Sequence, residues 1–116
     1  MNNRVLFIFI LNNSDYLDDI ITLFVELGVP GATIVESTGM VKYLSEEIPI
    51  FAGFREILQG ARESNRIIFS VMNKDLVPKV IKGIEEIVGS LNDPGTGVAF
   101  SLPVLESWGT GGNDEG

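Results

Sequence analysis

The first apolar segment of the chain, residues 5–11, is an unbroken run of seven β-branched, aromatic and aliphatic side chains. The run is too short for a free-standing helix and is typical of a strand that is buried on both faces. Residues 65–72, with their β-branched content, and residues 98–102 are two further strand segments. Residues 32–38 carry threonine, isoleucine and valine, and this segment ends before Gly39. The pattern of apolar positions therefore predicts four strands.

Between the first two strands the apolar positions recur every three or four residues, which predicts a helix with one apolar face. Ser14 is its expected N-cap, and Gly28 is expected to end it as the C′ residue. A second apolar stripe at helical spacing precedes the last strand. This second helix is expected to be capped by Asn73 or Asp75 and to continue to Leu91.

The order of the predicted elements is strand, helix, strand, strand, helix, strand, which is the ferredoxin-like βαββαβ arrangement. We expect an α+β fold in which a four-stranded antiparallel sheet carries two helices on one face. Because the first strand is apolar on both faces, something must also cover the second face of the sheet. We favour a partner subunit, and the alternative is that the inserted segment 40–64 folds across the sheet.

The connection between the second and third strands has roughly 26 residues, far more than a usual hairpin connection. Within it, residues 49–58 predict a short helix with Phe51, Phe54 and Leu58 on one side. Loops of this length are usually functional or disordered. The segment is expected either to enlarge the core or to form an arm that contacts an effector or a partner.

Composition narrows the chemistry of the protein. The chain has no cysteine and no histidine, which excludes disulfides, thiolate nucleophiles, Cys/His zinc sites and histidine acid–base catalysis. The adjacent carboxylate pairs are better explained as solvated charge, so we expect no enzyme activity. With 16 acidic and 8 basic residues and a net charge of -8, nucleic acid is not an expected partner, because phosphate neutralisation dominates such binding.

The length of 116 residues fits one domain, which we expect to cover residues 1–108. Residues 109–116 form a glycine-rich acidic tail that is expected to be flexible. No segment approaches the ~20 apolar residues needed to span a bilayer. We therefore expect a cytoplasmic protein without membrane insertion.

A glycine cluster precedes the last strand and contains Gly95, Thr96 and Gly97. It leads into a strand and not a helix, so it is neither a Walker nor a Rossmann fingerprint. Backbone N–H groups in consecutive turns can form an anion nest, whereas a purely structural turn is the alternative.

Two stretches of the chain resemble the PII signal-transduction superfamily. Residues 28–39 have the family's G-x-x-G-x-T spacing and end in a glycine that opens the long T-loop. Residues 95–100 are similar to the family's B-loop pattern G-D-G-K-I-F. The element order and the length of the 40–64 loop also match, so the resemblance covers about residues 4–104.

The resemblance implies a homotrimer whose sheets line its interior. It also implies that adenine nucleotides bind in the clefts between subunits and that the T-loop reports their presence to a regulated protein, a transporter or an enzyme. Carried over residue by residue, the family's nucleotide site falls on Gly31, Thr33, Gly39, Gly95, Thr96 and Gly97. The first two would lie near the nucleotide, the third at the root of the T-loop, and the last three around the phosphates.

The chain departs from the family where the family holds phosphate charge. Val98 stands where the family has the B-loop lysine, and no lysine or arginine follows Lys82. Three phosphates need positive charge or a metal as well as backbone donors. AMP or ADP is therefore the expected ligand in preference to ATP.

Two other functions stay open at this stage. A trimer could act as a ligand-independent protein-interaction module that docks its partner through the hydrophobic loop around Phe51 and Phe54. An amino-acid-binding regulatory domain has the same element order, but its middle strands are usually joined by a short connection. Trp108 is expected to pack on the sheet edge, and the alternative is that it covers a subunit cleft.

Overall fold

The computed structural model describes residues 3–47, 50 and 65–110. These residues form four strands and five helical elements. The elements in chain order are β1 (Arg4–Leu11), η1 (Ser14–Tyr16), α1 (Leu17–Glu26), β2 (Thr33–Ser37), α2 (Met40–Glu47), β3 (Asn65–Asn73), η3 (Lys74–Leu76), α4 (Val77–Val88) and β4 (Gly97–Pro103). The four predicted strands are confirmed, with ends that differ from the sequence prediction by no more than one residue.

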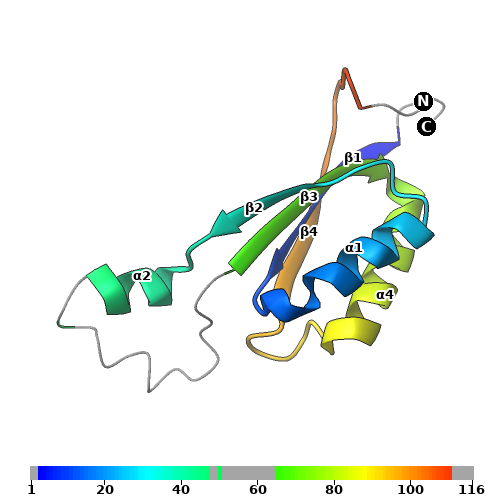
Figure 1. Cartoon of the computed structure of the whole chain (residues 1–116). Coiled ribbons are helices and arrows are strands. Elements are labelled where there is room, and N and C mark those ends of the chain that lie inside the picture. Colours follow the sequence, from blue (N-terminus) through cyan, green and yellow to red (C-terminus); the bar gives the residue numbers. More distant parts are fainter. Residues whose placement is uncertain (1–2, 48–49, 51–64, 111–116) are drawn as a thin grey trace.

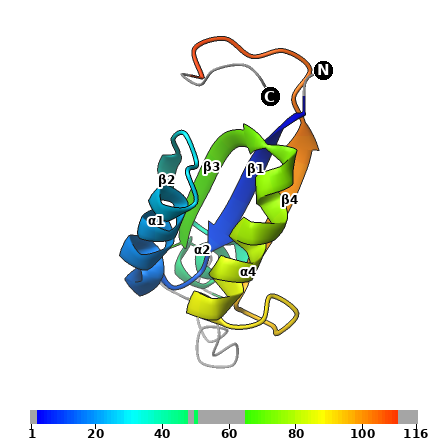
Figure 2. The ribbon, with the colours of Figure 1, turned by 90° about the vertical axis from the view of Figure 1, so that its right-hand side faces the viewer.

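The strands form one antiparallel sheet in the order β2-β3-β1-β4. Helices α1 and α4 cover one face of this sheet (Figure 1), as a view turned by 90° also shows (Figure 2). The predicted ferredoxin-like α+β fold is therefore confirmed. The buried core lies between the sheet and the two helices and consists of Val5, Phe7, Phe9, Leu11, Ile20, Phe24, Ile68, Met72, Val80 and Ile84.

Burial alternates along β1, so the prediction of a strand buried on both faces is wrong for the single chain. Phe7 and Phe9 point into the core, whereas Ile8 and its neighbours of the same parity remain only half-buried. Successive side chains of a strand point to opposite faces, and the two helices cover only one of them. The described helices therefore leave the second face of the sheet open to contact.

The described part of the inserted segment does not cover that face. Its first residues form α2, a helix that the sequence patterns did not predict, and α2 lies beyond the end of β2 and away from the sheet (Figure 1). The predicted helix with Phe51, Phe54 and Leu58 lies outside the described residues. Helix α2 thus lies beyond the end of the sheet and not across its open face.

Both long helices begin in the same way, with an asparagine cap and a single 3-10 turn. The predicted N-cap Ser14 is wrong, because the side chain of Asn13 accepts the hydrogen bond from the Asp15 amide at 3.0 Å. Of the two alternatives for the second helix, Asn73 is confirmed, since its side chain accepts from the Asp75 amide at 2.8 Å. Each cap satisfies an otherwise unpaired N–H group at the helix start.

Glycines end both helices. Gly28, with φ 79°, follows α1 as predicted. Helix α4 stops at Val88 and not at Leu91, because Gly89 takes a φ of 101°, a backbone conformation that a helix cannot continue. Among the described residues, no helix is both long and apolar enough to cross a membrane.

Candidate functional site

The candidate site lies where β2 begins. Strand β2 pairs with β3 only from Thr33–Phe69 to Ser37–Asn65, whereas β3 continues beside β1 as far as Asn73. Beyond Phe69 the incoming loop therefore replaces a strand at this edge of β3. An open pocket of about 290 Å³ lies there, lined by Pro30, Gly31, Ala32, Thr33, Phe69, Ser70, Val71, Gly109 and Thr110.

A buried hydroxyl fixes the loop that forms one wall of the pocket. The Ser70 hydroxyl donates a hydrogen bond to the Gly31 carbonyl, and Ser70 is only 4% exposed. Among the described residues, Ser70 is the only polar or charged residue that is buried. Because buried hydroxyl and carbonyl groups need partners, this bond sets where the loop runs relative to β3.

The fold gives no reason for glycine at Gly31. Its φ is not positive, and a β-carbon added there would meet no atom within 4 Å. Thr33 follows on β2, is exposed, and is paired with Phe69. Two of the residues singled out from the sequence, Gly31 and Thr33, are thus brought together in one pocket. The open space over Gly31 permits a close approach of a ligand to the backbone.

The pocket has a neutral lining. Its side chains include the hydroxyl groups of Thr33, Ser70 and Thr110 and the aromatic residue Phe69, and none of the described residues that line it is charged. Hydroxyl and backbone groups offer both donors and acceptors to a ligand. The arrangement suits a neutral, hydrogen-bonding group and not a cluster of phosphates.

The glycine cluster lies on the other edge of the sheet. Gly97 begins β4 and pairs with Leu11, and the Gly95 carbonyl accepts a hydrogen bond from Asn12 Nδ2 at 2.7 Å. The Thr96 amide donates to the Asp93 carbonyl at 3.4 Å. These bonds fold the 92–97 connection into a tight turn next to the end of β1.

Unlike Gly31, two residues of this cluster are glycine for reasons of the fold. Gly95 has φ 80°, and Gly97 has φ 153° with space for no side chain. A β-carbon on Gly97 would lie 2.9 Å from the Ile10 carbonyl oxygen and 2.9 Å from Phe9 Cε1. The structural explanation of the cluster therefore holds in the single chain whether or not the turn also binds an anion.

Gly39 lies at the same end of the sheet, at the root of the inserted segment. It stands between β2 and α2, and its carbonyl accepts the hydrogen bond from the Tyr43 amide at 3.0 Å. A β-carbon added to Gly39 would come within 3.3 Å of Asn65 Nδ2. Tight packing against the first residue of β3 thus accounts for a small residue at this position.

One chain does not bring the six predicted residues into one site. Gly31 and Thr33 belong to the β2 edge of the sheet, and the Gly95–Gly97 turn belongs to the β4 edge. Three strand spacings of about 4.8 Å separate these edges, or roughly 14 Å. The two groups could contact the same small ligand only if they came from different copies of the chain.

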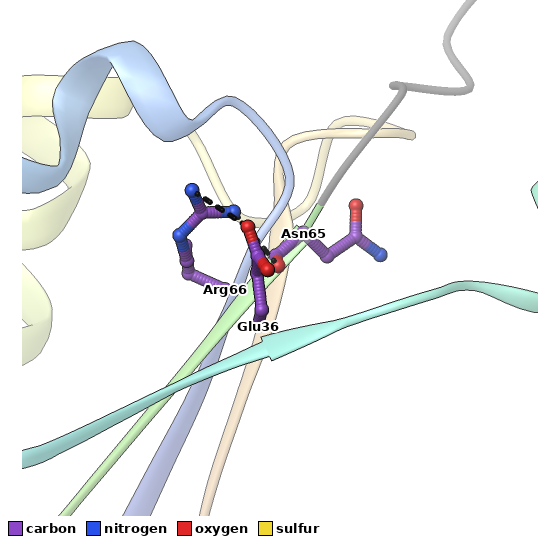
Figure 3. A network of polar contacts seen from close by, with 3 residues as sticks. All are labelled: Glu36, Asn65 and Arg66. Carbon is purple, nitrogen blue, oxygen red and sulfur yellow. Dashed lines mark hydrogen bonds and ion pairs between the residues drawn. The ribbon is translucent and has the colours of Figure 1, made fainter.

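A basic residue lies near the ends of the central strands and is already paired. Arg66 of β3 forms an ion pair with Glu36 of β2, with Nη2 and Oε2 3.3 Å apart (Figure 3). Its Nη1 donates to the Asn65 carbonyl at 3.4 Å. The Arg66 side chain is 23% exposed and the Glu36 side chain 73% exposed. This pair joins the edge strand to β3 near the start of the inserted segment.

Trp108 does not pack on the sheet edge, and that prediction is wrong for the single chain. Its side chain is 81% exposed, and Leu105 of the same segment is 90% exposed. Neither of these two side chains is covered by the described residues of the chain. That Trp108 covers a cleft between subunits stays a prediction.

Sequence reasoning missed most of the pocket lining. Ser70 carried a signal, because it is a polar residue at an inward position between the apolar inward residues Ile68 and Met72. Thr110 and Gly109 carried none, since they were placed in the tail and come next to β2 only through the fold.

The comparisons with known proteins support this fold. No protein-family model and no curated protein matches the sequence. Among solved structures, a DUF3240 family protein from Shewanella baltica OS155 aligns with a TM-score of 0.63 at 12% identity, over 93% of this chain and 97% of that chain.

Two PII proteins are also structurally similar. Arabidopsis thaliana PII, solved with citrate bound, aligns with a TM-score of 0.58 at 20% identity, over 89% of this chain and 78% of that chain. CPII from Thiomonas intermedia K12, solved with ADP, AMP and acetate, aligns with a TM-score of 0.55 at 17% identity, over 84% of this chain and 83% of that chain. Together with the sheet order and the helix layer, these similarities show that the chain has a divergent PII-like fold.

Proposed function

We propose that the protein is a cytoplasmic, homotrimeric sensor of an adenine nucleotide that regulates a partner protein through its 40–64 segment. The single observation that carries the proposal is the pocket at the start of β2, which contains Gly31 and Thr33. CPII from Thiomonas intermedia K12, a protein of the same fold, was solved with ADP and AMP. The protein would act by binding and not by catalysis, as a single domain over residues 1–108.

The size and lining of the pocket suit the nucleoside part of the ligand. A volume of about 290 Å³ is close to the lower limit of small-molecule pockets, which is about 300 Å³. Hydroxyl groups and backbone amides can bind the edges of a base, and Phe69 supplies an aromatic residue. Since the described residues that line the pocket are all uncharged, affinity would come from the base and ribose, which favours AMP or ADP over ATP.

The open face of the sheet supports the assembly that this site requires. Apolar residues of three strands lie side by side there, as in the row Phe100, Ile8 and Phe69 that the register defines. Phe100 is 44% exposed, Val98 54% and Leu102 45%. A contiguous apolar surface on a protein marks an interaction site. In our proposal, this face packs against the equivalent faces of two other copies.

A trimer would also explain why the predicted residues are split between two edges. In the proposed assembly the Gly95–Gly97 turn of one copy lies next to the Gly31–Thr33 pocket of its neighbour. The turn would then offer backbone N–H groups to the phosphate of a nucleotide whose base occupies the pocket. The 40–64 segment, which starts at Gly39 on the same edge as the pocket, would report occupancy to a transporter or an enzyme.

Calorimetry and thermal unfolding with AMP, ADP, ATP and cyclic AMP, with and without Mg²⁺, test the ligand. We expect AMP or ADP to raise the unfolding temperature, and we expect Thr33→Val to weaken that binding. Thr22→Val is the matched control, because Thr22 is exposed on α1, where its hydroxyl donates to the Asp18 carbonyl at 2.9 Å. If none of these nucleotides binds the wild-type chain, the sensor proposal is wrong.

One observation favours a second function, a trimeric interaction module that needs no ligand. Gly95 and Gly97 are explained by their backbone conformations and by the contact with Ile10, so the turn does not require a phosphate. Capture of the same partner by the wild-type chain with and without nucleotide would support this function, whereas nucleotide-dependent capture would support the sensor.

A further inference from the structure

The segment that follows β4 is held to the first residue of β1. We call residues 104–110 the C-terminal strap. The Val104 amide donates to the Arg4 carbonyl at 3.2 Å, and Arg4 Nη1 donates to Ser107 Oγ at 3.1 Å. The same nitrogen donates to Thr110 Oγ1 at 2.5 Å. One residue of β1 thus contacts the start, the middle and the end of the strap.

The strap reaches from the β4 edge of the sheet to the pocket at the β2 edge. From the end of β4 it crosses above the ends of the strands (Figure 2). Gly109 and Thr110 then line the pocket together with Gly31 and Thr33. Thr110 therefore belongs to two structures at once, since its hydroxyl binds Arg4 and the residue forms part of the pocket wall.

Apolar burial does not hold the strap in this place. Its two large apolar side chains, Leu105 and Trp108, are 90% and 81% exposed. Gly109 has φ 77°, a conformation that glycine adopts without steric cost. It also has no side chain that could pack against the sheet. The position of residues 107–110 thus depends on polar contacts, among which those from a charged guanidinium to hydroxyl oxygens are stronger than neutral hydrogen bonds.

We propose that Arg4 is a positioning residue for the pocket. By holding Ser107 and Thr110, the guanidinium fixes the wall that Gly109 and Thr110 form, and this wall sets the affinity of the pocket for its ligand. The identity of the ligand rests on the proposed function, but the position of the wall does not. Arg4 contacts the pocket lining at Thr110, which belongs to the strap, so we expect its effect on binding to pass through the strap.

The test compares Arg4→Gln with the wild-type chain and with Arg66→Gln as a matched control. Arg66→Gln also removes a guanidinium with a polar partner, but Arg66 binds Glu36 and does not line the pocket. Ser107→Ala is a second, milder variant, because it removes one acceptor of Arg4 and leaves the pocket lining intact. Arg4→Lys is the rescue variant, since its ammonium group can donate to both hydroxyls.

Two measurements need no nucleotide. Trp108 is the single tryptophan of the chain, so its time-resolved fluorescence anisotropy reports strap motion. Amide hydrogen exchange at residues 31–33 and 70–71 reports protection of the pocket. In Arg4→Gln we expect a larger fast component of the anisotropy decay and faster exchange at both sites, with smaller changes in Ser107→Ala. The Arg4→Lys and Arg66→Gln variants should resemble the wild type in both measurements.

The third measurement is the Kd for AMP by calorimetry. We expect Arg4→Gln to weaken AMP binding about tenfold, the size of effect that corresponds to one or two hydrogen bonds. A wild-type Kd retained in Arg4→Gln, or unchanged exchange at residues 31–33, would overturn the proposal. If the wild-type chain binds ADP and not AMP, the same comparison is made with ADP. If it binds no adenine nucleotide, the proposed function fails, and the exchange and anisotropy results alone then confirm or overturn the role of Arg4.

Discussion

The Ser70 side chain of β3 is joined to the Gly31 backbone of the loop before β2 by a hydrogen bond from hydroxyl to carbonyl. The two residues are 39 positions apart in the chain. The bond forms at the point where β2 and β3 stop pairing, which is also where the pocket opens. One buried polar contact therefore connects the stability of the sheet edge with the shape of the candidate site.

Replacing Ser70 by alanine should lower the stability of the protein. The change removes the donor, and the Gly31 carbonyl loses its partner, so we expect the free energy of unfolding to fall by about 1 kcal/mol. Urea unfolding followed by circular dichroism measures this loss. Ser101→Ala, at an exposed position of β4, should change stability by less than about 0.5 kcal/mol. A Ser70→Ala variant as stable as wild type would show that the bond does not hold the loop.

Replacing Gly83 by alanine should destabilise the protein, although alanine is the better helix former. Helices α1 and α4 approach closely at Gly83, where an added β-carbon would lie 2.5 Å from Leu23 Cδ1. In an exposed helix, glycine to alanine gains about 1 kcal/mol. Overpacking at a buried contact costs typically about 1–3 kcal/mol, so we expect a net loss of stability.

The double variant Gly83→Ala/Leu23→Ala separates the gain in helix propensity from the cost of overpacking against Leu23. Removing the Leu23 side chain makes space for the new methyl group, so the penalty of the second change should be smaller in the Leu23→Ala background. Thermal unfolding of the four proteins completes the cycle. If Gly83→Ala raises the unfolding temperature of the wild-type chain, the helices do not pack as closely as we describe.

Alanine at the two structural glycines of the 92–97 turn should have unequal effects. A β-carbon on Gly97 would press against the Ile10 carbonyl oxygen at 2.9 Å, and backbone atoms cannot move aside as a side chain can. A β-carbon on Gly95 would meet no atom within 4 Å, so the only cost of alanine there is the backbone strain at a φ of 80°. We expect Gly95→Ala to cost about 1 kcal/mol and Gly97→Ala clearly more, as measured by chemical unfolding. Equal costs for the two variants would contradict the close contact with Ile10.

The element order could be predicted because each strand and helix carries its own local signal. Runs of β-branched and aromatic residues mark the strands, and apolar stripes at helical spacing mark α1 and α4. The choice of the cap was not predictable, since asparagine and serine are about equally good N-caps. Asn13 and Ser14 stand next to each other, and the structure has Asn13 as the cap and Ser14 as the first residue of the 3-10 turn before α1.

Which side chains of β1 point into the core could not be predicted, for a different reason. All its residues from Val5 to Leu11 are apolar, so a period of two cannot distinguish the core side from the open side. The structure assigns Phe7 and Phe9 to the core and Ile8 to the open face. The pocket wall was even less predictable, because Arg4 and Thr110 are 106 residues apart in the chain and no local pattern marks a contact between them. Gly31 and Thr33 were predicted only because the stretch that contains them resembles a family motif.

Placing a charge on the open face of the sheet should dissociate the proposed trimer. Phe100 is 44% exposed in the single chain and lies in a row with Ile8 and Phe69, so Phe100→Glu would place a carboxylate in the centre of the subunit interface. A buried, unpaired charge is costly, whereas the same charge on a monomer surface is not. We expect light scattering to give a trimer mass for the wild type and a monomer mass for Phe100→Glu.

Val25→Glu is the control for this experiment. Val25 is 72% exposed on α1, in the helix layer on the other side of the sheet, so the same change in polarity there should leave the trimer intact. Circular dichroism should show that both variants are folded. A monomeric wild type, or a Phe100→Glu chain with the mass of the wild-type trimer, would mean that the open face is not the subunit interface. The pocket at Gly31 would then have to bind its ligand without the Gly95–Gly97 turn of a neighbour.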